Sequence, residues 1–137
     1  GAVLGINQLK RLDDNIKKRN VNYEIFLDKI DSKTYFTDFD IKGQSNYGFN
    51  FFLREPDLIL RDKIEQIMTD NNIEYRRGSA GGGNQLRQPY LKEFINDHDW
   101  LNYPNTDHIH HFGWYIGNYP NLERKKIEDI CGVLNDV

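Results

Sequence analysis

Apolar side chains recur at spacings of three, four and seven through the first thirty positions, with charged residues between them. This spacing puts them on one face of a helix and predicts a single helix over residues 2–30. At 1.5 Å per residue such a helix is about 43 Å long, which is long for a small domain. Residues 2–6 are apolar on nearly every side, and we expect them to be buried against a partner absent from this chain.

The next part of the chain alternates between strand-like and helix-like patterns. Residues 47–54 alternate and are rich in aromatic side chains, which is typical of a strand, and a short strand is also predicted around residues 35–39. A helix opened by proline and aspartate is predicted over residues 56–71, followed by a strand over residues 73–77. The apolar residues expected on one face of this helix are Leu58, Ile59, Ile64, Ile67 and Met68.

The remaining sequence is less regular. Residues 78–84 contain too much glycine to continue a strand. Short helices are predicted near residues 90–96 and 106–111, a third strand around 114–116, and a final helix over 122–137 with Ile127, Ile130, Cys131 and Leu134 facing inward. This order of elements predicts an α+β domain with two layers.

Composition narrows the class of protein. A chain of 137 residues, 38% hydrophobic and 13% aromatic, is typical of one folded domain and excludes a disordered chain. Eighteen Lys and Arg against 21 Asp and Glu give a net charge of −3, which favours neither nucleic acid nor an anionic membrane. No apolar run approaches the length of a membrane span. The single cysteine, Cys131, excludes a disulfide framework and a CxxC metal site, and we expect a soluble, cytoplasmic domain.

The glycine-rich segment 78–84 invites comparison with phosphate-binding loops. The P-loop needs a lysine directly after its last glycine, and the dinucleotide fingerprint needs a helix that begins there. Asn84 follows the last glycine instead, and Pro89 prevents an early helix. The favoured interpretation is therefore a flexible turn, or one whose backbone approaches a ligand.

A cluster of histidines is the second candidate for chemistry. On a helix, Asp107 with His111, and His108 with His111, would share one face and could bind a metal. Apart from an isolated His98, no second group has matching spacing. A surface or packing role for these histidines and for His110 is favoured, and a small metal-binding protein remains the weaker alternative. No spacing indicates a nucleophile with its base.

Three segments, in their order and separations, resemble one family. Ala2-Val-Leu-Gly-Ile-Asn-Gln-Leu-Lys-Arg-Leu-Asp13 resembles the helix that opens the C-terminal small domain of the DegT/DnrJ/EryC1/StrS sugar aminotransferases. Gly83-Asn-Gln-Leu-Arg-Gln-Pro-Tyr90 resembles the Gly-Asn-x-x-Arg-Gln-Pro signature of the 3-dehydrase branch of that family. Trp114-Tyr-Ile-Gly-Asn-Tyr-Pro-Asn-Leu122 is similar to the turn before the family's last helix. The resemblance covers almost the whole chain.

The resemblance implies a domain of a fold type I PLP enzyme, with a long N-terminal helix and a short, mainly antiparallel sheet. The enzyme would act on nucleotide-linked 4-keto-6-deoxy sugars by 3-dehydration or transamination, in deoxysugar and lipopolysaccharide biosynthesis. Residues 1–137 would form its C-terminal domain alone. The large domain that binds PLP would be missing, so we expect no activity from this chain by itself and a homodimer through the full-length parent. The alternative is a free-standing, non-catalytic binding or assembly module.

The same resemblance supplies candidate substrate-binding residues, namely Asn84, Arg87 and Gln88. The planar guanidinium of Arg87 suits a phosphate or sugar oxygens, and the two amides add neutral donors and acceptors. Without the family, an ion pair at the surface would be the favoured role of Arg87. No catalytic, cofactor-binding or metal-binding residue is assigned in this chain. The sequence does not choose between dehydration and transamination, and it does not specify the sugar or the nucleotide.

Overall fold

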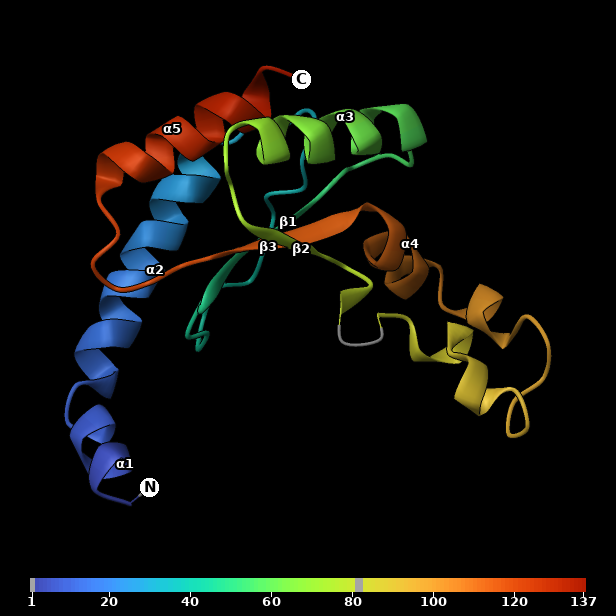
Figure 1. The fold of residues 1–137 in the computed structure, drawn as a ribbon, viewed down its shortest axis with the longest axis horizontal. Helices are drawn as coiled ribbons and strands as arrows, with labels where there is room; N and C mark the ends of the chain where they lie inside the picture. The colour runs from blue at the N-terminus through green and yellow to red at the C-terminus, as the bar shows by residue number, and fades with distance from the viewer. Residues whose placement is uncertain (1, 81–82) are drawn as a thin grey trace.

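A three-stranded antiparallel sheet organises the domain (Figure 1). The computed structural model describes residues 2–80 and 83–137, so Gly81 and Gly82 of the predicted turn lie outside the described residues. The strands follow the order β1 (Gly48–Phe52), β3 (Gly113–Gly117), β2 (Tyr75–Arg77), with β3 in the centre. The strands predicted over residues 47–54, 73–77 and 114–116 and the α+β class are confirmed.

The strand predicted around residues 35–39 is wrong. It is reduced to a single bridge between Tyr35 and Leu53. The amide of Phe39 donates to the carbonyl of Thr37 at 3.0 Å, and this tight turn directs the chain away from β1 after one bridge.

The helices surround the sheet unevenly. In Figure 1, α3 and α5 cross one face of the sheet and α2 runs beside α5, while α4 leads directly into the start of β3. The α-helices are α1 (Ala2–Leu9), α2 (Leu12–Lys29), α3 (Leu58–Asp70), α4 (Pro104–Phe112) and α5 (Arg124–Asn135). Among the described residues, the short 3₁₀ turns are η2 (Gln85–Arg87), η3 (Pro89–Leu91) and η4 (Asp99–Asn102). The helix predicted near residues 90–96 is wrong, because η3 ends at Leu91 and turns follow it. No helix within the described residues is long and apolar enough to cross a membrane.

Strand register explains where the core lies. Phe49 and Phe51 of β1 stand directly opposite Ile116 and Trp114 of β3, so all four side chains point to one face. These residues are buried against the helices, whose buried side chains include Tyr23 and Phe26 of α2, Ile64 and Met68 of α3, and Ile127, Cys131 and Leu134 of α5. The inward face predicted for the last helix is confirmed for three of its four residues, and Ile130 is half-buried.

The predicted first helix is interrupted. The amide of Arg11 donates to the carbonyl of Gln8, a 3₁₀-type bond that breaks the regular ladder between α1 and α2. No residue of α1 is buried, so tertiary contacts do not hold the helix straight through this point. The prediction of a single helix over residues 2–30 is therefore wrong, because the helix is broken between Leu9 and Leu12.

The apolar face predicted for α3 is only partly correct. Ile64 and Met68 are fully buried, whereas Leu58 is 57% and Ile59 is 84% exposed. Because each residue advances about 100° around a helix, Ile59 lies roughly 140° from Ile64 and cannot share its face. The side chain of Asp57 accepts a hydrogen bond from the amide of Leu60 at 2.9 Å and caps this helix.

A buried amide network fastens α2 to the sheet. The Asn118 side chain accepts from Asn22 Nδ2 at 3.0 Å and donates to the carbonyls of Arg19 and Asn46 at 2.9 and 2.8 Å. Asn118 is 3% exposed and lies just after β3, within the turn that resembles the family. At least one position of that turn therefore has a structural role.

Candidate functional site

The signature segment is packed against α4. Asn84 is 2% exposed, and its Oδ1 accepts from the amide of Leu86 at 3.2 Å, which caps η2. Its backbone amide donates to His110 Nδ1 at 3.0 Å, and its Nδ2 donates to Asp107 Oδ1 at 3.2 Å. In this chain Asn84 therefore shapes the loop and fixes it to α4.

Gly83 allows this close approach. Its φ is +55°, a region that favours glycine, and a Cβ at this position would lie 2.2 Å from His110 Nδ1 and 2.7 Å from the Cα of Ser79. The backbone approach expected from the glycine-rich sequence is present here, and it is made to a side chain of the same molecule.

Arg87 forms a two-point ion pair with Asp107. Its Nη2 donates to Asp107 Oδ2 at 2.8 Å, and its Nε donates to Oδ1. The guanidinium carbon also lies 3.7 Å from the centre of the Trp100 ring. The hydrogen bond from Arg87 lowers the pKa of Asp107, and the same bond raises the pKa of Arg87. The two charges largely cancel, and the side chains are 27% and 19% exposed, so this pair is more enclosed than the surface pair considered from the sequence.

Gln88 ends η2. Its amide donates to the carbonyl of Gln85 at 3.0 Å, and its extended backbone leads into Pro89. The residue is half-buried. The structure thus brings Asn84, Arg87 and Gln88 together on one loop, and substrate contact stays a prediction for all three.

The histidines of α4 serve packing and hydrogen bonding. His108 Nε2 lies 2.6 Å from the carbonyl of Leu53, and His111 Nε2 lies 3.9 Å from Asp107 Oδ2. Burial lowers the pKa of both His110 and His111, which favours the neutral ring that accepts the Asn84 amide. Residues 2–80 and 83–137 contain no group of three or more His, Cys, Asp or Glu able to hold a metal ion.

A cleft of about 740 Å³ lies between the end of β1 and α4, and we refer to it as the β1–α4 cleft. Its walls include the aromatic rings of Phe36, Phe52 and Trp100, and its polar groups include Arg54, Asp107, His108 and His111. Asp107 belongs both to this cleft and to the network of the signature loop. Sequence reasoning missed Phe36, Arg54 and Trp100, because no local pattern connects residues so far apart in the chain.

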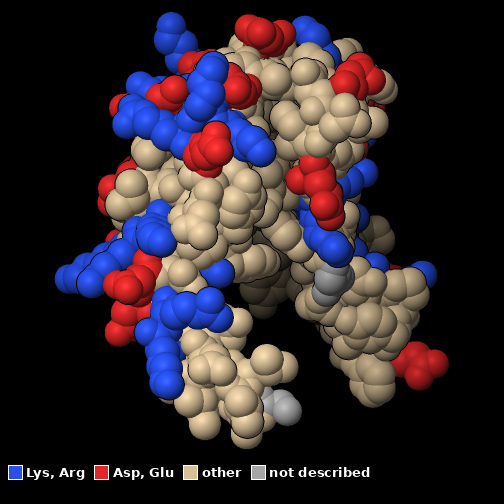
Figure 2. Space-filling view, turned by 60° about the vertical axis from the view of Figure 1, so that its left-hand side comes forward, with Lys and Arg blue, Asp and Glu red and all other residues tan. Residues whose placement is uncertain are grey.

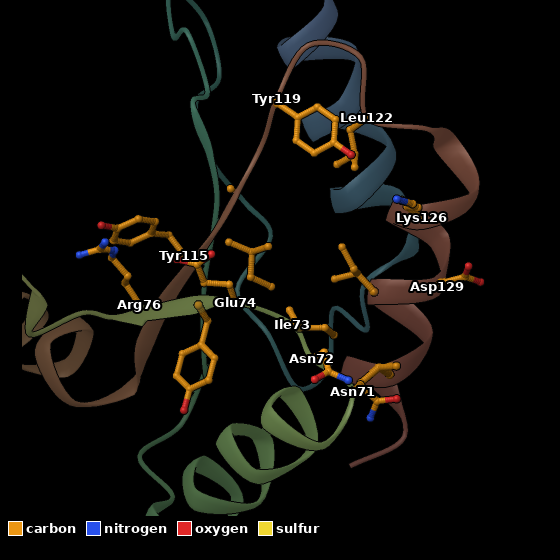
Figure 3. Close-up of a pocket in the computed structure, with 15 residues that line it drawn as sticks. Asn71, Asn72, Ile73, Glu74, Arg76, Tyr115, Tyr119, Leu122, Lys126 and Asp129 are labelled. Carbon is orange, nitrogen blue, oxygen red and sulfur yellow. The ribbon is translucent and has the colours of Figure 1, made fainter.

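A second cavity, of about 720 Å³, lies between the sheet and α5 (Figure 3). Ile73, Ile116, Leu122 and Ile130 contribute apolar walls. In Figure 3, Tyr115 and Arg76 stand on the side of the strands away from α5, and Asp129 points away from the sheet. No signature residue lines this cavity or the β1–α4 cleft. The cleft is the better candidate site because it is lined by Asp107, which is hydrogen-bonded to Asn84 and Arg87.

Among the described residues, no enclosed lysine is placed to hold PLP, the cofactor that the resemblance implies. All the lysines of the chain are exposed, and none lines the β1–α4 cleft. Lys126 borders the second cavity from the exposed surface of α5. The described residues therefore do not fit a site that would hold PLP through a lysine.

Comparison with known proteins gives a consistent result. The DegT/DnrJ/EryC1/StrS aminotransferase family matches residues 1–135. GDP-4-keto-6-deoxy-D-mannose 3-dehydratase of Escherichia coli O55:H7 is 27% identical over 119 residues, which cover 86% of this chain and 30% of that protein. Lipopolysaccharide biosynthesis protein RfbH of Salmonella typhimurium is 26% identical over 131 residues, covering 93% of this chain and 29% of that protein.

A solved structure shows the same fold in three dimensions. The E. coli GDP-4-keto-6-deoxy-D-mannose-3-dehydratase with bound hydrated PLP is 26% identical and superposes with a TM-score of 0.71. The match covers 95% of this chain and 33% of the E. coli enzyme. The chain thus spans about a third of the length of these relatives.

Proposed function

Because this chain belongs to the DegT/DnrJ/EryC1/StrS aminotransferase family, we propose that it is the substrate-side, C-terminal domain of a PLP- or PMP-dependent enzyme. The enzyme acts on nucleotide-linked 4-keto-6-deoxy sugars, by 3-dehydration or transamination, in lipopolysaccharide biosynthesis. One observation carries the proposal: the signature loop is fixed to α4 by Asp107 and His110, directly beside the β1–α4 cleft. A loop held in this way can present polar groups to a ligand at little cost in entropy.

Exposed apolar residues support the proposal that a large domain packs against this one. Val3, Leu4, Ile6 and Leu9 of α1 are 57–74% exposed, and α1 contains no charged residue. Figure 2 shows this uncharged tip below a charged upper surface, with a hollow between it and the lobe that follows residues 81–82. That lobe exposes further large side chains, namely Tyr90, Phe94, Leu101 and Tyr103. In our proposal the large domain, which holds PLP, covers these surfaces, and the full-length parent forms a homodimer.

Within this proposal, Arg87 and Gln88 contact the sugar, and Asn84 keeps the loop in place. We expect GDP-mannose, a stable sugar nucleotide, to shift the backbone NMR resonances of residues 84–88. Arg87→Lys keeps the charge but removes the planar fork, so it should weaken binding about fivefold to tenfold. Arg124→Lys, at an exposed arginine on α5, is the matched control and should bind like the unaltered chain. Shifts confined to other parts of the domain would contradict the proposal.

The assembly module remains a second candidate, because the apolar face of α1 is unpartnered in the chain. In that case α1 mediates self-association. The double substitution Leu4→Glu and Leu9→Glu should then reduce the mass measured by analytical ultracentrifugation to that of a monomer. Because both side chains are about 70% exposed, the free energy of unfolding should change by no more than about 0.5 kcal/mol. Ile59→Glu, at an apolar residue of α3 that is even more exposed, should leave the mass unchanged. A chain that is already monomeric at high concentration would exclude this candidate.

A further inference from the structure

The β1–α4 cleft contains an arginine that no carboxylate neutralises. Among the described residues, Arg54 takes part in no ion pair; its Nε donates to the carbonyl of Ser32 at 2.6 Å. The side chain is exposed, and its guanidinium lies 5.6 Å from the centre of the Phe36 ring. The cleft's one carboxylate, Asp107, is paired with Arg87. The charge left in the cleft is therefore positive and favours an anion.

Arg87 is less suited to a diphosphate than Arg54. Its Nε and Nη2 are already engaged by Asp107, and the pair is close to neutral. An anion that approached Arg87 would also approach the Asp107 carboxylate, which repels it. Arg54 has no such neighbour among the described ion pairs, so the guanidinium can bind two phosphate oxygens with charge-assisted hydrogen bonds.

Aromatic rings occupy the walls beside Arg54. Phe36 and Phe52 are stacked with ring centres 4.9 Å apart, and both line the cleft. Trp100 of η4 contributes a third ring to the lining. A cavity of about 740 Å³ with apolar walls and few polar groups falls within the range of small-molecule sites, and planar rings bind favourably to such walls.

From these features we infer that the β1–α4 cleft binds the nucleoside diphosphate part of the substrate, with the diphosphate on Arg54 and the base among the aromatic rings. This inference rests on the proposed function, which places the sugar at Arg87 and Gln88. It assigns a binding role to Arg54, a residue outside the signature segment. Because Asp107 lines the cleft and anchors the loop, the two ends of one ligand would lie on either side of it.

The test uses GDP, guanosine and inorganic pyrophosphate as separate probes of the 137-residue chain. Trp100 lines the cleft, whereas the chain's other tryptophan, Trp114, is 3% exposed in the core, so quenching of Trp100 fluorescence reports binding. Arg54→Gln should lower the affinity for GDP and for pyrophosphate about tenfold or more, and it should change the affinity for guanosine by no more than about twofold. The affinity of Arg54→Lys for GDP should lie between that of the unaltered chain and that of Arg54→Gln. Arg76→Gln, at an exposed arginine of β2 outside the cleft, is the matched control.

Two results would overturn the inference: GDP binding that Arg54→Gln leaves within about twofold, or no quenching by GDP at millimolar concentration. Thermal melting of both Arg54 variants separates lost binding from lost folding. The proposed function fails independently, if GDP-mannose binds without shifting residues 84–88. If Arg54→Gln weakens GDP binding but GDP-mannose does not shift residues 84–88, the nucleotide site is supported and the sugar-binding role of the loop is rejected.

Discussion

Replacing Asn118 with alanine is expected to lower the free energy of unfolding by about 2–4 kcal/mol. The carbonyls of Arg19 and Asn46 would lose the donor they share, and Asn22 Nδ2 would keep only its 3.2 Å bond to the carbonyl of Tyr119. Because Asn118 is 3% exposed, water reaches these groups poorly and each unsatisfied acceptor is costly. The loss of side-chain volume adds a cavity contribution.

Urea denaturation measures this effect, with an unchanged dependence on urea concentration as the sign that the folded state is otherwise intact. Asn121→Ala is a matched control from the same turn, since within residues 2–80 and 83–137 the one bond of its side chain is the exposed bond that it accepts from Lys18 at 3.1 Å. The control should change the free energy of unfolding by less than about 0.5 kcal/mol. Equal values for the two variants would show that the buried network contributes little.

The sequence predicted the elements whose signals are local. Alternating aromatic residues predicted β1, and spacings of three and four predicted the buried side of α5. The break after Leu9 was not predictable, because apolar periodicity continues through it while burial does not: Tyr23 and Phe26 are buried and Leu4 is 71% exposed. A helical pattern specifies a face, but only the tertiary structure determines whether anything covers it.

The sequence predicted the loop of the candidate site, but it did not predict which residues contact that loop. The glycine and asparagine of the signature indicated a close backbone approach, and Gly83 makes one. Its contact, His110, lies in α4, which the sequence predicts as a short helix near residues 106–111, but no pattern connects that helix with the signature. Arg87 and Asp107 are twenty positions apart, with two 3₁₀ turns between them, so no helical or strand spacing connects them. The pair depends on the fold of the intervening lobe.

Asp107→Asn is expected to lower the free energy of unfolding at pH 7 by about 1–3 kcal/mol. The variant removes the charge that Arg87 faces, while the guanidinium stays largely enclosed above Trp100. The loss is smaller than for a fully buried pair because both side chains retain some exposure to solvent. Asp129→Asn, at an exposed carboxylate paired with Lys125 on α5, is the control and should cost about 0.5 kcal/mol or less.

The pH dependence distinguishes this ion pair from a purely steric contact. Because Arg87 lowers the pKa of Asp107 in the folded state, the unfolded chain binds the proton more readily, and acid favours unfolding. The stabilisation is complete above the ordinary aspartate pKa of about 3.9 and is lost as the pH falls through the lower pKa of the folded state. Urea titrations should therefore show the difference between unaltered and variant chains at full size near neutral pH, and shrinking below that ordinary pKa. A difference that persists undiminished in acid would mean that Asp107 acts by shape alone, and the signature loop would then not depend on its charge.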